Sequence, residues 1–439
     1  MVVLEAPPVR DTRRVSAAVA AAGVSSFALL YAPQPVLPQL AAGFRLDPGS
    51  ASLTIGVATG ALAVAVLPVA WLAGLVGRRR VIVWSVLASA IIGLLLPLAP
   101  SFSVLLVMRA VQGVAVAGFA GVAAAYLADA VGTARLPAAV GAMIAGNSVG
   151  GMLGRLGAGF AAGPMGWHGA LLAVAVLSLL CALFAALTLP RDQAPQPGSE
   201  VTELGSETPG RGPGARESGP QPPGRGSRSP ESGPQPAGRG PRSPESGSPE
   251  AGPVRRARLG AGLVGPFTVG ALATGAFVAL YNAAGFRLAA PPLSLAPAAA
   301  SLVFLSYAMG TASSAAAGRL AQRLGWTKAL VTALAVTVAG SVLTAHTSLP
   351  LVAAGFAVLT AGFFAAHAIA NAWVAAEAPP SARGRAAGVY TLCYYLGSGL
   401  GGTAGGVVYG HAGWAWLIGL TSAWLALAIV AVLMTRRSR

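Results

Sequence analysis

Long apolar segments recur along the whole chain and are separated by short polar turns. Each segment runs for about 20 residues, the length that an α-helix needs to cross a hydrocarbon layer roughly 30 Å thick. The segments lack the apolar–polar alternation of β-barrel strands. Twelve membrane-spanning helices are therefore predicted, at residues 17–40, 52–75, 81–100, 102–127, 136–161, 166–189, 259–284, 296–318, 328–347, 349–375, 384–409 and 412–435.

Composition supports this prediction and excludes an ordinary soluble domain. The chain is 55% hydrophobic and 10% charged, with a mean hydropathy of +0.68, whereas soluble domains carry about 25% charged residues. One stretch, residues 191–258, is instead rich in Pro, Gly, Ser, Arg and Glu. Since it has almost no bulky apolar residues, we expect a disordered cytoplasmic linker. A partner-binding segment is the alternative.

The formal net charge of +16 raises the question of a nucleic-acid partner, but the distribution of the charges answers it. Basic clusters occupy the termini and every second loop, and the opposite loops hold only Arg45 and Arg287. This is the pattern of the positive-inside rule. Both termini are predicted to be cytoplasmic, the lipid bilayer is the partner, and no nucleic acid is expected. No cleavable signal peptide is evident.

The chain reads as two copies of one six-span unit. The string FALLY at 27–31 recurs as FVALY at 277–281, and the pair Gly166-Trp167 recurs as Gly413-Trp414. A direct repeat with an even number of spans gives two bundles of the same orientation, with a substrate path between them. The predicted parts are a tail (1–16), an N-terminal bundle (17–190), the linker (191–258), a C-terminal bundle (259–435) and a tail (436–439).

Four strings within the spans carry a family resemblance. They are YAPQPVLP at 31–38, GNSVGGMLGRL at 146–156, GFFAAHAIANAW at 362–373 and YYLGSGLGGTAGG at 394–406. With the two-bundle organisation, they resemble the major facilitator superfamily, in its drug-efflux-like twelve-helix branch, and within it the YnfM-type inner-membrane transport proteins. The resemblance implies an all-α membrane protein of twelve helices, two six-helix bundles related by a direct repeat, that works by alternating access in a bacterial cytoplasmic membrane.

The loops after spans two and eight resemble a superfamily signature that latches neighbouring helix ends through an Asp–Arg interaction. The acidic position of that signature holds Gly74 in one half and Gln322 in the other. The resemblance thus implies a latch without its charge pair; a plain basic loop is the alternative. The residues retained from the signature are Gly77, Arg78, Arg79, Gly318, Arg323 and Gly325.

Span five carries glycines at every fourth position, Gly146, Gly150 and Gly154, in a string that resembles an antiporter-type motif. Gly151 stands at the motif's Pro position and Arg155 at its last Gly. Small residues at this spacing form a flat stripe on which a neighbouring backbone packs closely. The stripe recurs in span eleven at Gly397 and Gly401. We expect two surfaces on which helices pack and slide; packing alone is the alternative.

Two arginines lie well inside predicted spans, Arg109 and Arg155. Arg109 belongs to a string, RAVQG, that resembles a superfamily motif tied to coupling and gating, and Gln112 lies one turn away. No Asp or Glu lies deep in a span, so a polar site shared by both arginines would favour anionic or neutral substrates. Snorkelling of Arg109 to the membrane surface, or pairing of either arginine with backbone carbonyls or lipid headgroups, is the alternative.

A proton-coupled transporter needs a titratable group, and His367 is the one central residue that titrates near neutrality. We expect a role in coupling or substrate binding for it; a structural histidine is the alternative. The superfamily resemblance places spans one, four, seven and ten around the cavity. The further candidates for substrate binding are Tyr31, Gln34, Asn147, Tyr281, Asn282 and Asn371.

The sequence therefore predicts a secondary active transporter that exports a small organic solute in exchange for protons. An uncoupled facilitator or importer, and a non-transporting membrane sensor or scaffold, are the alternatives. No phosphate-binding loop, paired carboxylates or metal-ligand spacing occurs, so no enzymatic activity, metal or cofactor is predicted. A functional monomer is expected.

Overall fold

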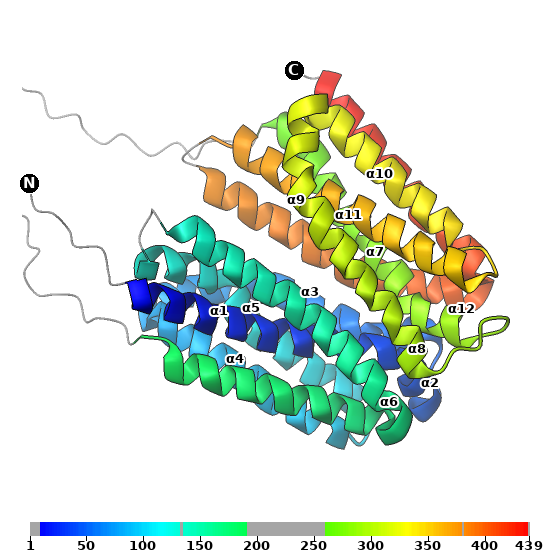
Figure 1. The fold of residues 1–439 in the computed structure, drawn as a ribbon, viewed down its shortest axis with the longest axis horizontal. Helices are drawn as coiled ribbons and strands as arrows, with labels where there is room; N and C mark the ends of the chain where they lie inside the picture. Colours follow the sequence, from blue (N-terminus) through cyan, green and yellow to red (C-terminus); the bar gives the residue numbers. More distant parts are fainter. Residues whose placement is uncertain (1–8, 132–134, 191–259, 380–381, 438–439) are drawn as a thin grey trace, which may run out of the picture. The chain divides into compact units, whose positions relative to one another are not determined.

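The computed structural model describes residues 9–131, 135–190, 260–379 and 382–437, and these residues form helices and short turns without a strand. The predicted linker, 191–258, and the tail residues 1–8 and 438–439 lie outside this part. The all-α class predicted from the apolar segments is confirmed (Figure 1).

The N-terminal half contains the helices α1 (Val9–Tyr31), η1 (Gln34–Val36), α2 (Leu37–Phe44), α3 (Pro48–Val76), α4 (Arg78–Leu95), η2 (Leu96–Leu98), α5 (Phe102–Val131) and α6 (Leu136–Thr188). The C-terminal half contains η3 (Ala261–Leu263), α7 (Val264–Ala289), α8 (Pro297–Ser301), η4 (Leu302–Ser306), α9 (Tyr307–Leu324), α10 (Trp326–Leu343), α11 (Leu349–Glu377) and α12 (Arg383–Arg437).

Ten helical runs of the described residues are long and apolar enough to cross a membrane. Two of them, α6 with 53 residues and α12 with 55, are more than twice the necessary length. Each breaks at one glycine with a positive φ, Gly166 at 64° and Gly413 at 82°, a conformation that side chains with a Cβ rarely adopt. These are the glycines of the repeated Gly-Trp pair, and each break divides its run into two spans, so the ten runs supply the twelve predicted spans.

The first span is interrupted where its prolines cluster. Helix α1 ends at Tyr31, and the chain continues through η1 into α2. Pro33 has no N–H group, so it leaves the Leu29 carbonyl without its usual helical donor. These prolines thus make the span irregular, and the break leaves α1 with carbonyl groups that need another partner.

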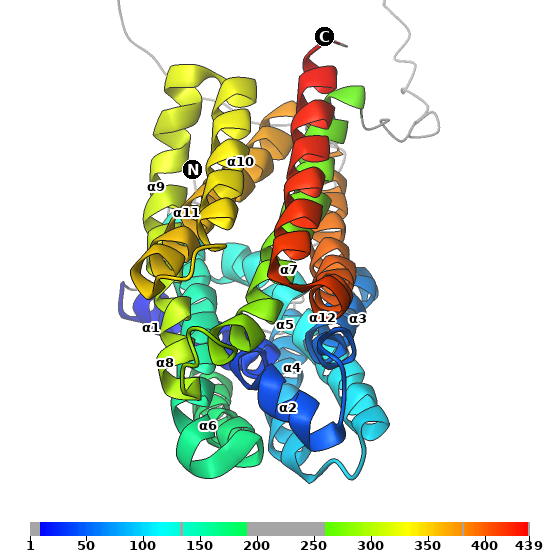
Figure 2. The ribbon, with the colours of Figure 1, turned by 90° about the vertical axis from the view of Figure 1, so that its right-hand side faces the viewer.

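The glycine stripes bring two pairs of helices into backbone contact, α1 with α6 and α7 with α12, which lie side by side in both views (Figure 1, Figure 2). A Cβ added at Gly150 would lie 2.5 Å from the Cα of Val24, and one at Gly397 would lie 2.1 Å from the carbonyl oxygen of Ala271. Nothing larger than glycine fits without separating the helices. Gly146, Gly154, Gly401 and Gly405 make equivalent contacts, with Ala20, Ala28, Gly275 and Ala279.

The two halves use the stripe in the same register. Gly150 contacts Val24, and Gly397 contacts Ala271. The step from Gly150 to Gly397 and the step from Val24 to Ala271 are equal in sequence. The match of FALLY with FVALY therefore lies three residues, about one helical turn, out of step with the packing.

The halves meet through small residues near the start of α3, at the end of the bundle opposite the chain termini. Asp47 caps α3 by accepting from the Gly49 and Ser50 N–H groups at 2.8 and 3.0 Å. Hydrogen bonds from the Ser50 hydroxyl and these N–H groups hold the pKa of Asp47 below its usual value. About two turns further along α3, a Cβ at Gly56 would lie 2.5 Å from the Thr403 hydroxyl oxygen of α12.

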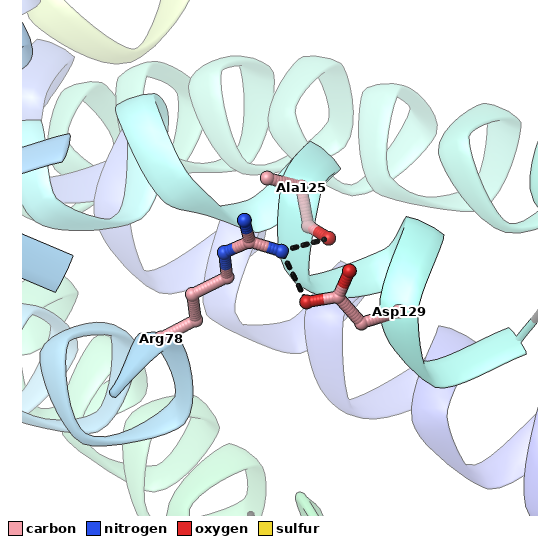
Figure 3. A network of polar contacts seen from close by, with 3 residues as sticks. All are labelled: Arg78, Ala125 and Asp129. Atoms are coloured by element: carbon pink, nitrogen blue, oxygen red, sulfur yellow. Dashed lines mark hydrogen bonds and ion pairs between the residues drawn. The ribbon is translucent and has the colours of Figure 1, made fainter. Parts of the chain in front are cut away.

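The loop between α3 and α4 ties the opposite end of the N-terminal half together. The Arg78 side chain donates to the Asp129 carboxylate and, at 3.2 Å, to the Ala125 carbonyl of α5 (Figure 3). Arg79 donates to the carbonyls of Ala186 and Leu189 at the end of α6, at 3.1 and 3.0 Å. The expectation that no charge pair forms here is wrong, because α5 supplies the carboxylate that the loop lacks.

The corresponding loop of the C-terminal half has a different contact. Gly77 and Gly325 both adopt a positive φ, 104° and 76°, so the turn itself is conserved between the halves. Trp326 follows Gly325 and packs on Trp373, with 6.4 Å between ring centroids. Arg323 is exposed, and a Cβ at Gly318 would meet no described atom within 4 Å.

Replacing Gly150 with Ala should destabilise the protein, because the new methyl group displaces the backbone of α1. The expected loss is about 1–3 kcal/mol, the usual effect of overpacking. Gly141→Ala, in the same helix, is the matched control, because a Cβ there meets nothing within 4 Å. Thermal unfolding followed by tryptophan fluorescence measures both variants, and equal melting temperatures would contradict the close contact.

Asp129→Asn should change the stability by less than about 1 kcal/mol, because the Arg78 and Asp129 side chains are 40% and 65% exposed and exposed ion pairs contribute little. Arg79→Gln should cost more, since it removes two hydrogen bonds to the end of α6. The same unfolding measurement compares the two variants. A larger loss for Asp129→Asn would show that the ion pair, and not Arg79, holds this end together.

Candidate functional site

Arg155 of α6 is the centre of a polar site within the spans. Its side chain is buried, with 3% of its surface exposed. The Nε–H group donates to the Gln34 side-chain oxygen at 2.5 Å, and Nη1 donates to the Gly151 carbonyl at 2.8 Å. Among the described residues Nη2 has no hydrogen-bond partner, so one edge of the guanidinium group retains unused donors.

Aromatic rings enclose the guanidinium group. Its carbon lies 4.0 Å from the ring centroid of Tyr31, 4.6 Å from that of Tyr307 and 5.4 Å from that of Phe304. Rings at these distances stabilise a cation through their negative faces. The rings come from α1, α9 and η4, so both halves of the chain build this aromatic cage. The acidic residues of the described spans lie only at helix ends, as Asp129 and Glu377 do, so no carboxylate neutralises Arg155.

Gln34 connects this site with the C-terminal half. Its Nε2–H group donates to the Asn282 side-chain oxygen of α7 at 2.7 Å, while its own oxygen accepts from Arg155. Both Gln34 and Asn282 are buried, at 1% and 0% exposure. The Nδ2 atom of Asn282 is buried without a hydrogen-bond partner. Three of the predicted residues, Gln34, Arg155 and Asn282, thus form one continuous chain across the two halves.

Arg109 of α5 does not share this site, and the expectation that it does is wrong. Its guanidinium group donates to the carbonyls of Leu29 and Leu30 at 3.2 and 2.6 Å, and to that of Thr54 at 2.8 Å. The first two carbonyls lie at the end of α1, where Pro33 removes the helical donor and the helix dipole attracts a cation. The residue is fully buried, so its donors are used to close the end of a helix.

Gln112 supports Arg109 through hydrogen bonds. Its side-chain oxygen accepts from Arg109 Nη1, and its Nε2–H group donates to the Ser89 carbonyl of α4 at 2.9 Å. Gln112 thereby links α5 to α4. Together, Arg109 and Gln112 connect α5 with α1, α3 and α4 through hydrogen bonds to backbone carbonyls.

His367 of α11 lies in a separate aromatic cluster. Its Nδ1 atom is 2.8 Å from the Tyr390 hydroxyl of α12. The Tyr394 and Phe363 rings lie 4.8 and 6.1 Å from the imidazole, between centroids. No acidic side chain contacts it among the described residues. Asn371, one turn along, is exposed and has no hydrogen-bond partner in the described ranges.

Of the remaining candidates, Tyr281 contacts the aromatic cage and Asn147 lies at the α1–α6 contact. The Tyr281 hydroxyl shares hydrogen bonds with the hydroxyls of Ser306 and, at 2.6 Å, Thr360, and its ring lies 5.3 Å from Tyr307 of the cage. Tyr281 therefore supports the cage from behind. Asn147 lies against Gly23 of α1, and its oxygen is buried without a partner.

Sequence reasoning missed Phe304 and Tyr307 of the cage and Tyr390 beside His367. Aromatic residues within spans are common in helix packing, and these three carry no distinguishing spacing. Only the fold shows that α9 and η4 pass over α6 at Arg155.

Comparison with known proteins agrees with this architecture. The sequence profile of the Major Facilitator Superfamily matches residues 19–225 and 267–439. The uncharacterized MFS-type transporter YybF of Bacillus subtilis (strain 168) is 30% identical over 426 residues, which cover 95% of this chain and 92% of YybF. The inner membrane transport protein YnfM of Escherichia coli (strain K12) is 32% identical over 401 residues, which cover 91% of this chain and 85% of YnfM.

Solved structures show the same fold at low sequence identity. A bacterial homologue of the human lysosomal transporter Spinster superposes with a TM-score of 0.71 at 14% identity, covering 98% of this chain and 96% of the homologue. The nucleoside transporter NupG superposes with a TM-score of 0.66 at 15% identity, covering 96% of this chain and 99% of NupG. The chain therefore belongs to the Major Facilitator Superfamily and is a multi-pass membrane transporter, not an enzyme.

Proposed function

We propose that the protein exports a small organic solute, anionic in preference to neutral, across the cytoplasmic membrane by alternating access, in exchange for protons. The observation that carries the proposal is the state of Arg155: a buried guanidinium group, enclosed by aromatic rings, with unused donors at Nη2 and no carboxylate beside it. A bound anion supplies the missing counter-charge. Burial of an unpaired charge is unfavourable, so the site favours anions over cations.

The cage also suits the body of such a solute. Tyr31, Phe304 and Tyr307 surround the charge with apolar ring faces, and Tyr281 fixes the far side through Ser306 and Thr360. Binding sites for small organic molecules combine an apolar lining with a few placed polar groups. We infer a carboxylate attached to an aromatic or branched apolar group.

The topology supports export from the side that carries the termini. Basic clusters lie at that end, which we take to face the cytoplasm. The tight contacts between the halves, such as Gly56 with Thr403 and Gly159 with Ser301, lie toward the opposite end. The described arrangement is thus closed toward the outside, and the substrate is expected to enter the site from the cytoplasm.

Sliding of the glycine stripes supports the change of access. Alternating access requires helices to move against each other without losing their packing. In the α1–α6 and α7–α12 pairs the glycines pack directly on the neighbouring backbone, so no interlocking side chains at these positions oppose sliding. The loop arginines Arg78 and Arg79 hold helix ends on the cytoplasmic side of the N-terminal half, where we expect them to restrain this movement.

His367 is the proposed proton-coupling group. Its Nδ1 atom forms a hydrogen bond with the Tyr390 hydroxyl across the α11–α12 contact, so a change in its charge alters a contact inside the moving half. Its environment of Phe363 and Tyr394 contains no fixed charge that would hold either protonation state.

Arg155→Gln should reduce transport of a carboxylate probe such as benzoate at least about tenfold, since it removes a buried charge-assisted contact. Arg155→Lys should restore it only in part, because an ammonium group lacks the planar donor pair. Uptake into inside-out vesicles measures the effect, with Arg287→Gln in the last turn of α7 as the control for loss of charge. Undiminished benzoate transport by Arg155→Gln, or faster transport of an organic cation by the wild type, would contradict the proposed substrate class.

His367→Gln should abolish solute-driven proton flux while counterflow of the solute, which needs no net proton movement, continues. Proteoliposomes with an enclosed pH dye report the flux, and exchange of labelled benzoate reports counterflow. His346→Gln, outside the spans, is the matched control. If proton flux persists in His367→Gln, coupling does not run through this residue; if the wild type shows none, the protein is a facilitator.

A further inference from the structure

We propose that Gln34 and Asn282 act as a positioning pair that couples occupancy of Arg155 to the contact between the two halves. In the empty protein the pair holds the outer end closed, and a carboxylate bound at Arg155 weakens it. This inference rests on the proposed function only in taking the ligand of Arg155 to be an anion.

Gln34 is placed so that it cannot leave one partner without affecting the other. Its single amide group accepts from Arg155 Nε–H at 2.5 Å and donates to the Asn282 oxygen at 2.7 Å. The break after Tyr31 puts this residue on η1, outside the regular helix. Because it is 1% exposed, water does not replace either bond.

Ligand geometry brings the carboxylate into competition with Gln34. A planar guanidinium group pairs with a carboxylate through two neighbouring N–H groups, and the side-on pair consists of Nε and Nη2. Nη2 is unused among the described residues, whereas Nε is occupied by the Gln34 oxygen. A carboxylate that uses this edge must therefore displace that oxygen.

Loss of the arginine contact weakens the remaining bond of the amide. A donor at the Gln34 oxygen polarises the amide and strengthens its N–H as a donor to Asn282, since hydrogen bonds in a chain are cooperative. Among hydrogen bonds between described residues, Gln34–Asn282 is the only one that joins the two halves. The other contacts between the halves named above are the Phe304 and Tyr307 rings on Arg155 and the packing of small groups, such as Gly56 with Thr403. None of these contacts is a hydrogen bond.

Binding and closure are then thermodynamically linked. If the carboxylate weakens the contact between the halves, opening of that contact raises the affinity of Arg155 for the carboxylate by the same factor. The empty transporter stays closed toward the outside, and the loaded one is released to open there. Such a pair makes the exit step depend on the presence of cargo.

The test uses the full-length protein with spin labels at Ala42→Cys and Thr347→Cys, two exposed positions of the outer end in different halves. The background is Cys181→Ala with Cys393→Ala, which removes both native cysteines. Without ligand, Asn282→Ala and Arg155→Gln should each raise the ratio of long to short label distances by about five- to thirtyfold, the effect of one or two lost buried interactions. The double variant should raise it no further than either single variant.

Thr274→Val is the matched control on α7, because its buried hydroxyl has no hydrogen-bond partner and its loss should leave the distances unchanged. Asn282→Leu provides a second variant in case Asn282→Ala does not fold. It keeps a side chain of similar size and removes the acceptor of the Gln34 amide, so it should also lengthen the distances. Additive shifts in the double variant, or a shift in Asn282→Ala but none in Arg155→Gln, would overturn the coupling.

A ligand arm identifies the direction of the coupling. Benzoate should lengthen the distances in the otherwise wild-type labelled protein, and benzamide, its uncharged counterpart, should not. Benzoate should add nothing in Asn282→Ala. A shorter distance with benzoate would overturn the proposal, since it would mean that the released Gln34 pairs twice with Asn282, using the unpartnered Nδ2.

The two proposals fail separately in this design. Absence of benzoate binding to the wild type, measured by calorimetry, would contradict the proposed anionic substrate, whereas the unliganded variants would still decide whether Arg155, Gln34 and Asn282 act as one unit. Binding of benzoate with no change in distance would leave the substrate class intact and overturn the coupling.

Discussion

Close approach of backbones between α1 and α6, and between α7 and α12, is the constraint on which the rest of this structure depends. Without a hydrophobic driving force between helices in lipid, association relies on tight packing, and Gly150 and Gly397 supply it by leaving no side chain in the way. The contact fixes where α6 passes the end of α1, and so it places Arg155 over Tyr31. A position that accepts only glycine thus determines the geometry of a charge five residues away.

Much of this architecture could be predicted from residue patterns because the membrane simplifies the problem. Twenty-residue apolar runs have one stable form in lipid, and the repeated Gly-Trp pairs marked both points where a continuous helical run breaks. The glycine spacing predicted backbone contact. The string match of FALLY with FVALY gave the wrong register for the first span of each half, however: Gly397 meets Ala271 and not Thr274, and Ala271 is the residue that corresponds to Val24 at the offset of the glycines.

The partners of the polar side chains were harder to predict, because they depend on which helices lie close together in the fold. Arg109 and Arg155 look alike in sequence, yet one closes the broken end of α1 and the other keeps unused donors inside an aromatic cage. The proline break that creates acceptors for Arg109 was visible in the string YAPQPVLP; that an arginine of α5 would reach it was not. Asp129 likewise became a partner of Arg78 only through the proximity of α5, which compensates for the glycine at the acidic position of the loop.

The absence of carboxylates from the spans has an electrical consequence. For the proposed export of a monovalent anion bound at Arg155, no acidic residue deep in the described spans offsets Arg109 and Arg155, and the anion would travel as charge that the protein does not carry back. Its passage outward would be electrogenic, and a negative-inside membrane potential would drive it with about 2.3 kcal/mol per 100 mV. The proposed exchange for an inward-moving proton would double the charge moved per cycle. The membrane voltage would then be a driving force in its own right, to which a carrier that moves uncharged cargo without protons would be indifferent.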